Sequence, residues 1–263
     1  MIVFAPGVHD PERVEHLADG SVDGVVLTTT LLHSPLPAEL TRHRFPFVLL
    51  NRIVDDLDAD SCSVDNFAGA CTVAASMLDC GHRRIGAIFG PSETSTGRDR
   101  EAGFRRALGD RGAPLEPALT RRGRFSFADG HRHMLDLLDG PSRPSAVFCA
   151  NDVIALGAMN AALGRVVPVP GELSIVGFDD ITMTGWEAFR VTTVRQDISR
   201  MGRTAIDLLL ARLADPDRPT QRVVLPAELV RRSTLAPPSP TGRSRRQRRS
   251  MSAVPLGPGS PPG

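Results

Sequence analysis

Two pairs of polar residues follow two buried strands expected in the middle of the chain. Asn151 and Asp152 come directly after the first apolar run, and Asp179 and Asp180 come directly after the second. Two apolar runs joined by a helix of about a dozen residues are typical of a βαβ unit in a parallel sheet. Open α/β sheets bind ligands at the carboxyl ends of their strands. The four side chains are therefore predicted to exchange hydrogen bonds with a ligand.

A structural role competes with this interpretation, because Asn and Asp are also preferred caps at the start of a helix. We expect Asn151 or Asp152 to cap the helix that begins there, and the other polar groups to face the ligand crevice. All 31 basic residues are Arg, so the chain offers no P-loop lysine, Schiff-base lysine or lysine base. No Ser-His pair or reactive Cys accompanies the four residues. The site is predicted to bind a ligand without turning it over, and we expect no cofactor and no metal ion.

The elements around this unit alternate between strands and helices. Such alternation is typical of doubly wound α/β layers, and here it predicts two of them in series. A helix is also expected from Asp10, before the second strand. Strands are expected at 2–5, 22–27, 45–50, 61–64, 84–90, 117–122, 146–150, 173–178, 222–225 and 229–232, with helices at 37–43, 65–80, 98–111, 127–139 and 198–213 and one opening at 151–152.

Ordered sequence blocks in the same region resemble the effector-binding core of the lactose-repressor (LacI/GalR) family of bacterial transcription regulators. The central block is PSAVFCAND, followed by ALGAMNAA and VPGELSIVGFDD. Further blocks are VDNFAG (64–69), GHRRIGAIFGP (81–91), RDREAGFRRAL (98–108), TTVRQD (192–197) and LVRRST (229–234). The resemblance covers about residues 1 to 236. It implies an α/β, periplasmic-binding-protein-like fold of two lobes, each a parallel sheet flanked by helices.

The resemblance also implies three chain crossings between the lobes, near Gly81-His82, Gln196-Asp197 and Pro226-Ala227. The expected organisation is residues 1–81 in the first lobe, 82–195 in the second, 196–225 back in the first and 226–236 back in the second. Residues 237–263 are crowded with Pro, Gly, Ser and Arg and have no apolar period. Such a composition is typical of a disordered tail.

In the resembled family, effectors bind between the lobes. Its ligand-binding positions, carried over by motif, fall on Arg100, Phe125, Asn151 and Asp179, with Ile198 as an apolar wall from the first lobe. Arg, Asp and Asn can pair with hydroxyl groups, and an aromatic face packs on the C–H surface of a sugar. Arg100 also shares its helical register with Phe104 and Ala107, which separates it from its neighbouring arginines. The resemblance thus predicts a small-molecule effector, most simply a sugar.

The implied function is the effector-binding and dimerisation module of a transcriptional regulator, in which ligand-driven lobe closure controls operator DNA binding. Members of the family begin with a helix-turn-helix headpiece, followed by a first strand and helix. None of these is in this chain, so we expect a truncated record with an incomplete first lobe. A complete protein is expected to be a homodimer that binds operator DNA through that headpiece.

Two other functions remain open from the sequence alone. A sugar-binding protein of a transport system would have the same two-lobe fold, but no signal peptide is visible at Met1, and no apolar run reaches the roughly 18 residues of a membrane span. We therefore expect a cytoplasmic protein with no membrane contact. An enzyme is the weakest alternative, because GxGxxG, GxSxG, HExxH and P-loop patterns are all absent.

Overall fold

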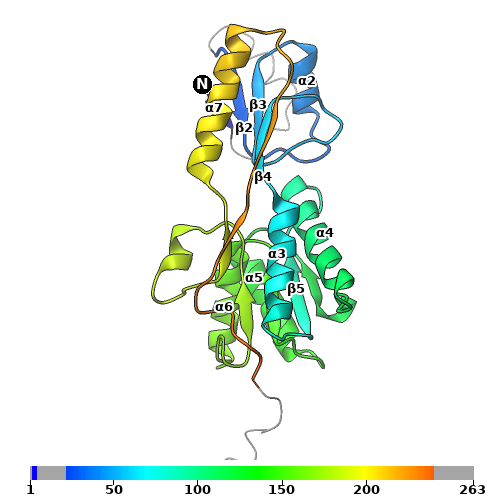
Figure 1. The fold of residues 1–263 in the computed structure, drawn as a ribbon, viewed down its shortest axis with the longest axis vertical. Helices are drawn as coiled ribbons and strands as arrows, with labels where there is room; N and C mark the ends of the chain where they lie inside the picture. Colours follow the sequence, from blue (N-terminus) through cyan, green and yellow to red (C-terminus); the bar gives the residue numbers. More distant parts are fainter. Residues whose placement is uncertain (1, 5–21, 240–263) are drawn as a thin grey trace, which may run out of the picture.

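The protein folds as two α/β lobes that lie end to end (Figure 1). The structure, a computed structural model, describes residues 2–4 and 22–239. The helix expected from Asp10 and most of the predicted tail lie outside the described residues. Parallel sheets flanked by helices confirm the predicted fold class.

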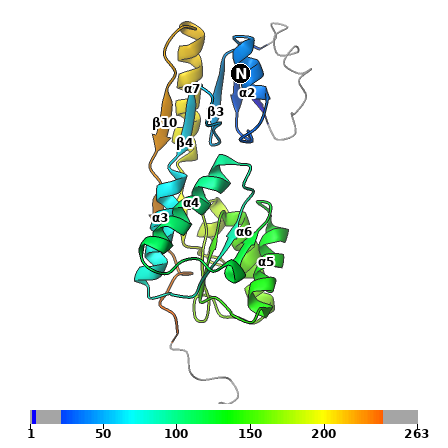
Figure 2. The ribbon, with the colours of Figure 1, turned by 90° about the vertical axis from the view of Figure 1, so that its right-hand side faces the viewer.

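The first lobe is built on one parallel sheet in the order β1-β2-β3-β4-β10. Its strands are β1 (Ile2–Phe4), β2 (Val25–Leu27), β3 (Phe47–Leu50), β4 (Ser61–Val64) and β10 (Arg222–Leu225). Successive strand residues point to opposite faces, so Val25 and Leu49 pack on the side of α2 (Leu36–Arg42), whereas Val26 and Val48 pack on α7 (Ile198–Ala214). α7 covers β2, β3 and β4, and Figure 2 shows it on the opposite side of this lobe from α2.

The second lobe has a four-stranded parallel sheet in the order β6-β5-β7-β8. Its strands are β5 (Ile85–Phe89), β6 (Thr120–Arg122), β7 (Ala146–Cys149) and β8 (Ser174–Val176). One core lies under α3 (Asn66–Asp79) and α4 (Ser95–Asp110), and the other lies under α5 (Phe127–Asp139) and α6 (Asp152–Gly164). Two further strands, β9 (Thr193–Arg195) and β11 (Glu228–Val230), pair antiparallel. The predicted βαβ unit is therefore β7-α6-β8.

The first crossing between the lobes differs from the one expected at residue 81. Val64 ends β4 in the first-lobe sheet, and Asp65 caps α3 at once by accepting a hydrogen bond from Ala68 N at 2.8 Å. The apolar face of α3 then enters the second-lobe core, where Met77 packs in the same cluster as Phe104. The chain therefore crosses at Val64-Asp65, and residues 66–81 belong to the second lobe. The helix was assigned to the wrong lobe because its buried face alone does not specify which sheet it covers.

The close packing of α3 on α4 depends on Gly103. A Cβ atom at this position would lie 2.2 Å from the Phe67 carbonyl oxygen, whereas a Cβ at Gly109 in the same helix would meet nothing within 4 Å. We expect Gly103→Ala to lose about 1–3 kcal/mol of unfolding free energy through overpacking. Gly109→Ala should instead gain up to about 1 kcal/mol from helix propensity. Urea unfolding of both variants measures this, and equal changes in the two would contradict the described packing.

Candidate functional site

The loops at the carboxyl ends of the two sheets meet between the lobes. Loops after β2 and β3 of the first lobe contact the segment that follows β5 of the second lobe. Three contacts join them: Leu32 N donates to the Glu93 carbonyl at 2.8 Å, Ile53 N donates to Ser95 Oγ at 3.0 Å, and Arg98 forms an ion pair with Asp55. This inter-lobe region is where ligands of open α/β sheets are expected.

Arg100 of α4 is the most fully engaged residue of the region, and only 3% of its surface is exposed. Its Nη2 lies 2.9 Å from Asp179 Oδ1, its Nε donates to Asn66 Oδ1 at 2.7 Å and its Nη1 donates to the Ala150 carbonyl at 2.6 Å. The guanidinium carbon also lies 3.8 Å from the centroid of the Phe178 ring. Burial lowers the pKa of Arg100, and the Asp179 carboxylate opposes this. The three donors fix the guanidinium at the ends of β7 and β8.

Asp179 is held toward Arg100 by an uncommon backbone conformation. Its φ is +120°, a region that non-glycine residues rarely adopt and that is concentrated at functional sites. Its N donates to the Val194 carbonyl at 2.8 Å, and its carboxylate also accepts a hydrogen bond from Gln196 Nε2. Burial raises the pKa of Asp179, whereas Arg100 and Gln196 act to lower it. The carboxylate therefore links α4 to the crossing that follows β9.

Asn151 has the capping role predicted for one of the pair, whereas Asp152 has a structural role that the sequence did not indicate. Asn151 Oδ1 accepts a hydrogen bond from Ile154 N at 2.9 Å and caps α6. Asp152 has no exposed surface, and its two oxygens accept hydrogen bonds from Thr193 Oγ1 at 2.6 Å and from Ile181 N at 2.9 Å. Burial raises the pKa of Asp152 to about 7. Asp152 thus braces the loop after β8 and does not face the crevice.

Asp180 also has a bracing role, because it pairs with Arg195 at 2.7 Å and with Arg232 at 2.5 Å. These two arginines outweigh the opposing effect of burial and lower the pKa of Asp180. Of the four polar residues that follow the two strands, Asp179 is therefore the one that reaches Arg100.

Phe125 lies at the end of β5, against Gly90. A Cβ atom on Gly90 would lie 2.2 Å from the Phe125 ring, so a larger residue there would displace the ring. The Arg52 guanidinium carbon of the first lobe lies 6.0 Å from the centroid of the same ring. Phe125 is thus placed where the lobes approach each other.

Among residues 2–4 and 22–239, the Ile198 side chain belongs to none of the core clusters and forms no hydrogen bond with the other predicted site residues. It begins α7, and 64% of its surface is exposed. The residue of this crossing that reaches Asp179 is Gln196, which is only 9% exposed. Its Oε1 is buried without a hydrogen-bond partner among residues 2–4 and 22–239. An acceptor in this state is costly unless a ligand or water supplies a donor.

Three residues of the region were missed from the sequence: Asn66, Gln196 and Arg52. Asn66 lies in the VDNFAG block and Gln196 in the TTVRQD block, so a polar residue inside a matched block was the available signal. Arg52 had a weaker signal, namely its position two residues after the end of a strand.

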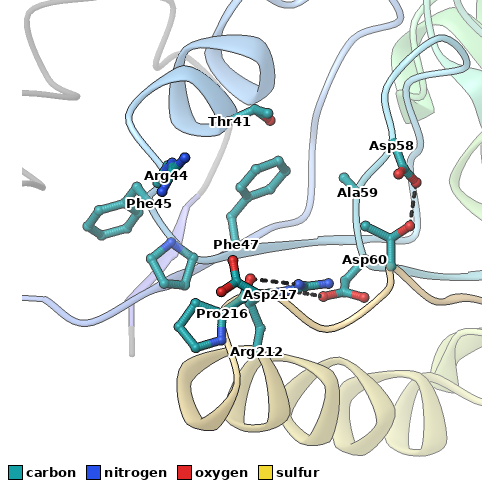
Figure 3. Close-up of a pocket in the computed structure, with 12 residues that line it drawn as sticks. Thr41, Arg44, Phe45, Phe47, Asp58, Ala59, Asp60, Arg212, Pro216 and Asp217 are labelled. Atoms are coloured by element: carbon teal, nitrogen blue, oxygen red, sulfur yellow. Dashed lines mark hydrogen bonds and ion pairs between the residues drawn. The ribbon is translucent and has the colours of Figure 1, made fainter.

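A hollow lies at the opposite end of the first lobe, near the start of β3 and the end of α7 (Figure 3). It has a volume of about 440 Å³, and its lining includes Asp60, Arg212 and Thr220. Arg212 Nε donates to Asp60 at 2.9 Å, and Thr220 donates to Asp58. None of the five predicted site residues lines this hollow. The inter-lobe region is therefore the candidate site.

Comparison with known proteins agrees with the two-lobe architecture. Residues 74–235 match the family model of the periplasmic binding protein-like domain. The chain is 33% identical over 239 residues to the HTH-type transcriptional repressor PurR of Haemophilus influenzae (strain PittGG), and the match covers 86% of this chain and 70% of that repressor.

Comparison with solved structures also supports the two-lobe architecture. A regulatory protein of the LacI family from Chloroflexus aggregans superposes with a TM-score of 0.81 at 31% identity, covering 88% of this chain and 83% of that one. The cellobiose complex of the transcriptional regulator CelR has a TM-score of 0.81 at 31% identity, covering 87% of this chain and 71% of that one. These relatives are regulators of transcription and not enzymes. In the part of the chain that the structure describes, no helix has the length and apolar character needed to cross a membrane.

Proposed function

Because the chain belongs to the LacI family of transcriptional regulators, we propose that a small hydroxylated effector, most simply a sugar, binds between its two lobes. The chain carries the effector-binding domain of such a regulator. Binding of the effector controls operator DNA binding through the helix-turn-helix headpiece of the complete regulator. That regulator acts as a homodimer in the cytoplasm.

The observation that carries this proposal is the buried Arg100–Asp179 pair at the ends of β7 and β8. Breaking a buried ion pair from one side is costly, so Arg100 and Asp179 hold each other in a fixed position at this edge of the sheet. Asp179 can accept from adjacent hydroxyl groups, and Asn151, capping α6 at the same edge, adds an amide. The Phe125 ring offers an apolar face for C–H groups. The cellobiose complex of the similar regulator CelR supports a sugar.

Coupling to DNA binding follows if the effector binds the two lobe arrangements with different affinity. Residues on both lobes approach the site, with Arg52 from the first lobe and Arg100, Phe125 and Asp179 from the second. A ligand that contacts both sets stabilises the arrangement in which the lobes are close. The headpiece precedes the first lobe in the complete regulator, so a change in the first lobe's orientation reaches the DNA.

A thermal-shift panel of pentoses, hexoses, disaccharides and purines tests the proposal. The effector, at 100 times its Kd, should add about 2.7 kcal/mol to the free energy of unfolding. The mirror-image sugar provides the control, because it matches every bulk property of the ligand and should give no shift. No specific shift with any member of the panel, or equal shifts with both mirror images, would contradict a working site.

The Arg98–Asp55 ion pair offers a separate test of the lobe arrangement, because its partners belong to different lobes. Exposed ion pairs contribute about 0.2–1 kcal/mol. Arg98→Gln should therefore weaken effector binding by up to about fivefold in low salt, and the difference should shrink in high salt. Arg106→Gln is the matched control, because Arg106 pairs with Asp110 inside α4. Calorimetric titration of both variants measures the effect, and equal affinities would show that binding does not depend on this contact.

A further inference from the structure

Arg52 brings a second guanidinium into the inter-lobe region from the first lobe. It follows β3, and its guanidinium carbon lies 6.0 Å from the centroid of the Phe125 ring in the second lobe. Its Nη1 donates to the Thr29 carbonyl at 3.3 Å. Its Nε is buried and has no hydrogen-bond partner among the residues that the structure describes. One edge of the guanidinium is thus held by the protein, whereas the Nε edge is not.

The charges of Arg52 and Arg100 are balanced differently. Arg100 has its carboxylate partner, Asp179, at 2.9 Å. Within residues 2–4 and 22–239, Arg52 forms no ion pair. Burial lowers the pKa of Arg52, the charge of Arg100 lowers it further, and the carboxylate of Glu93 acts in the opposite direction. Arg52 thus feels a carboxylate only at a distance, and no carboxylate of the described residues is within ion-pair distance of it.

A half-buried guanidinium without a directly bonded carboxylate is unfavourable, and an anionic ligand that bonds to it removes that cost. Arginine binds carboxylate and phosphate groups through two parallel N–H bonds made by one edge of the fork. The edge that contains Nε is the one that Arg52 leaves free, because Nη1 is directed at Thr29. We propose that the effector carries a carboxylate or phosphoryl group, which the Nε edge of Arg52 binds beside Phe125. This inference rests on the proposed function and names the chemical class of its effector.

Matched ligands that differ only in the anionic group test the inference on the full chain. The probes are D-glucose with D-gluconate and D-glucose 6-phosphate, D-ribose with D-ribose 5-phosphate, and adenosine with adenosine monophosphate, titrated calorimetrically at constant ionic strength. We expect at least one anionic member to bind ten times more tightly than its neutral partner. The comparison of carboxylate with phosphate identifies which anion the site accepts.

The variant Arg52→Gln should remove this advantage, while Arg52→Lys, which keeps the charge without the fork, should retain part of it. Arg42→Gln is the matched control, because Arg42 is an exposed first-lobe arginine paired with Glu39. Without ligand, Arg52→Gln should melt at the same temperature as the wild type or higher, because an unpaired charge is removed. A purely structural role for Arg52 would lower its melting temperature instead.

The outcomes separate the inference from the proposed function. If neutral members bind as tightly as their anionic partners, or if Arg52→Gln leaves the preference unchanged, the inference fails and the proposed function stands. A destabilised Arg52→Gln protein with an unchanged ligand preference would also overturn the inference. If no neutral or anionic member binds with a Kd of 10 mM or below, which corresponds to about 2.7 kcal/mol of binding free energy, both the inference and the proposed function fail.

Discussion

Replacing Arg100 by Met is expected to abolish effector binding and to lower the free energy of unfolding by about 3–5 kcal/mol, the usual cost of breaking a buried ion pair from one side. The substitution leaves the Asp179 carboxylate buried against an apolar side chain. It also removes the donors to Asn66 and to the Ala150 carbonyl. Urea unfolding measures the loss of stability, and calorimetric titration measures the loss of binding.

Two further variants show how much of the lost stability comes from leaving the Asp179 charge unpaired. Asp179→Asn combined with Arg100→Met removes both charges, so it should recover part of the stability but none of the binding. Arg105→Gln on the same helix is the control, because Arg105 pairs with Glu101 at the surface, and it should change stability by no more than about 1 kcal/mol. A fully stable Arg100→Met protein that still binds effector would contradict the assigned site.

Asp152→Asn is expected to change how stability depends on pH. Burial raises the pKa of Asp152 in the folded protein from 3.8 to about 7, so folding favours the protonated carboxyl group. The stability that Asp152 contributes to the folded protein is therefore fully present below pH 3.8 and is lost as the pH rises through about 7. Asparagine carries no charge at any pH. The free energy of unfolding of the variant should therefore rise relative to that of the wild type as the pH increases. The expected rise is about 1.4 kcal/mol per pH unit, or up to about 4 kcal/mol from pH 4 to pH 8.

Urea unfolding of both proteins at pH 4 to pH 8 measures this difference, because all other titrating groups are common to the two. Asparagine can keep both contacts, since its carbonyl oxygen can accept from Ile181 N and its amide can donate to Thr193 Oγ1. Asp180→Asn should instead be less stable than the wild type by a nearly constant amount across this range, because Arg232 and Arg195 lower the pKa of Asp180 despite burial and its contribution is lost only below pH 3.8. Parallel stability curves for the wild type and Asp152→Asn would show that Asp152 is charged in the folded protein.

The strands and helices could be predicted because their patterns are local. Continuous apolar runs such as 146–150 indicated buried parallel strands, and polar residues directly after them indicated caps or ligand groups. The lobe to which α3 belongs was not predictable in the same way. Its apolar face fits either sheet. The lobe is decided by packing against α4, which begins sixteen residues after α3 ends.

The site shows the same division between local and long-range information. Arg100 and Asp179 stand in distinctive sequence blocks, and they do form an ion pair. Asn151 was harder to assign, because a side chain that caps a helix and one that binds a ligand occur at the same place in the sequence. The place of Arg52 after a strand gave only a weak signal, since its approach to Phe125 requires both lobes to be folded and in contact.

The most direct test of the inter-lobe site is a crystal structure of the chain with the ligand that raises its melting temperature most. We expect ligand oxygen atoms within hydrogen-bonding distance of Asp179 and Arg52, with the Phe125 ring against the apolar face of the ligand. A ligand bound instead in the hollow beside Arg212 and Asp60 (Figure 3) would contradict this expectation. That result would move the effector site to the opposite end of the first lobe.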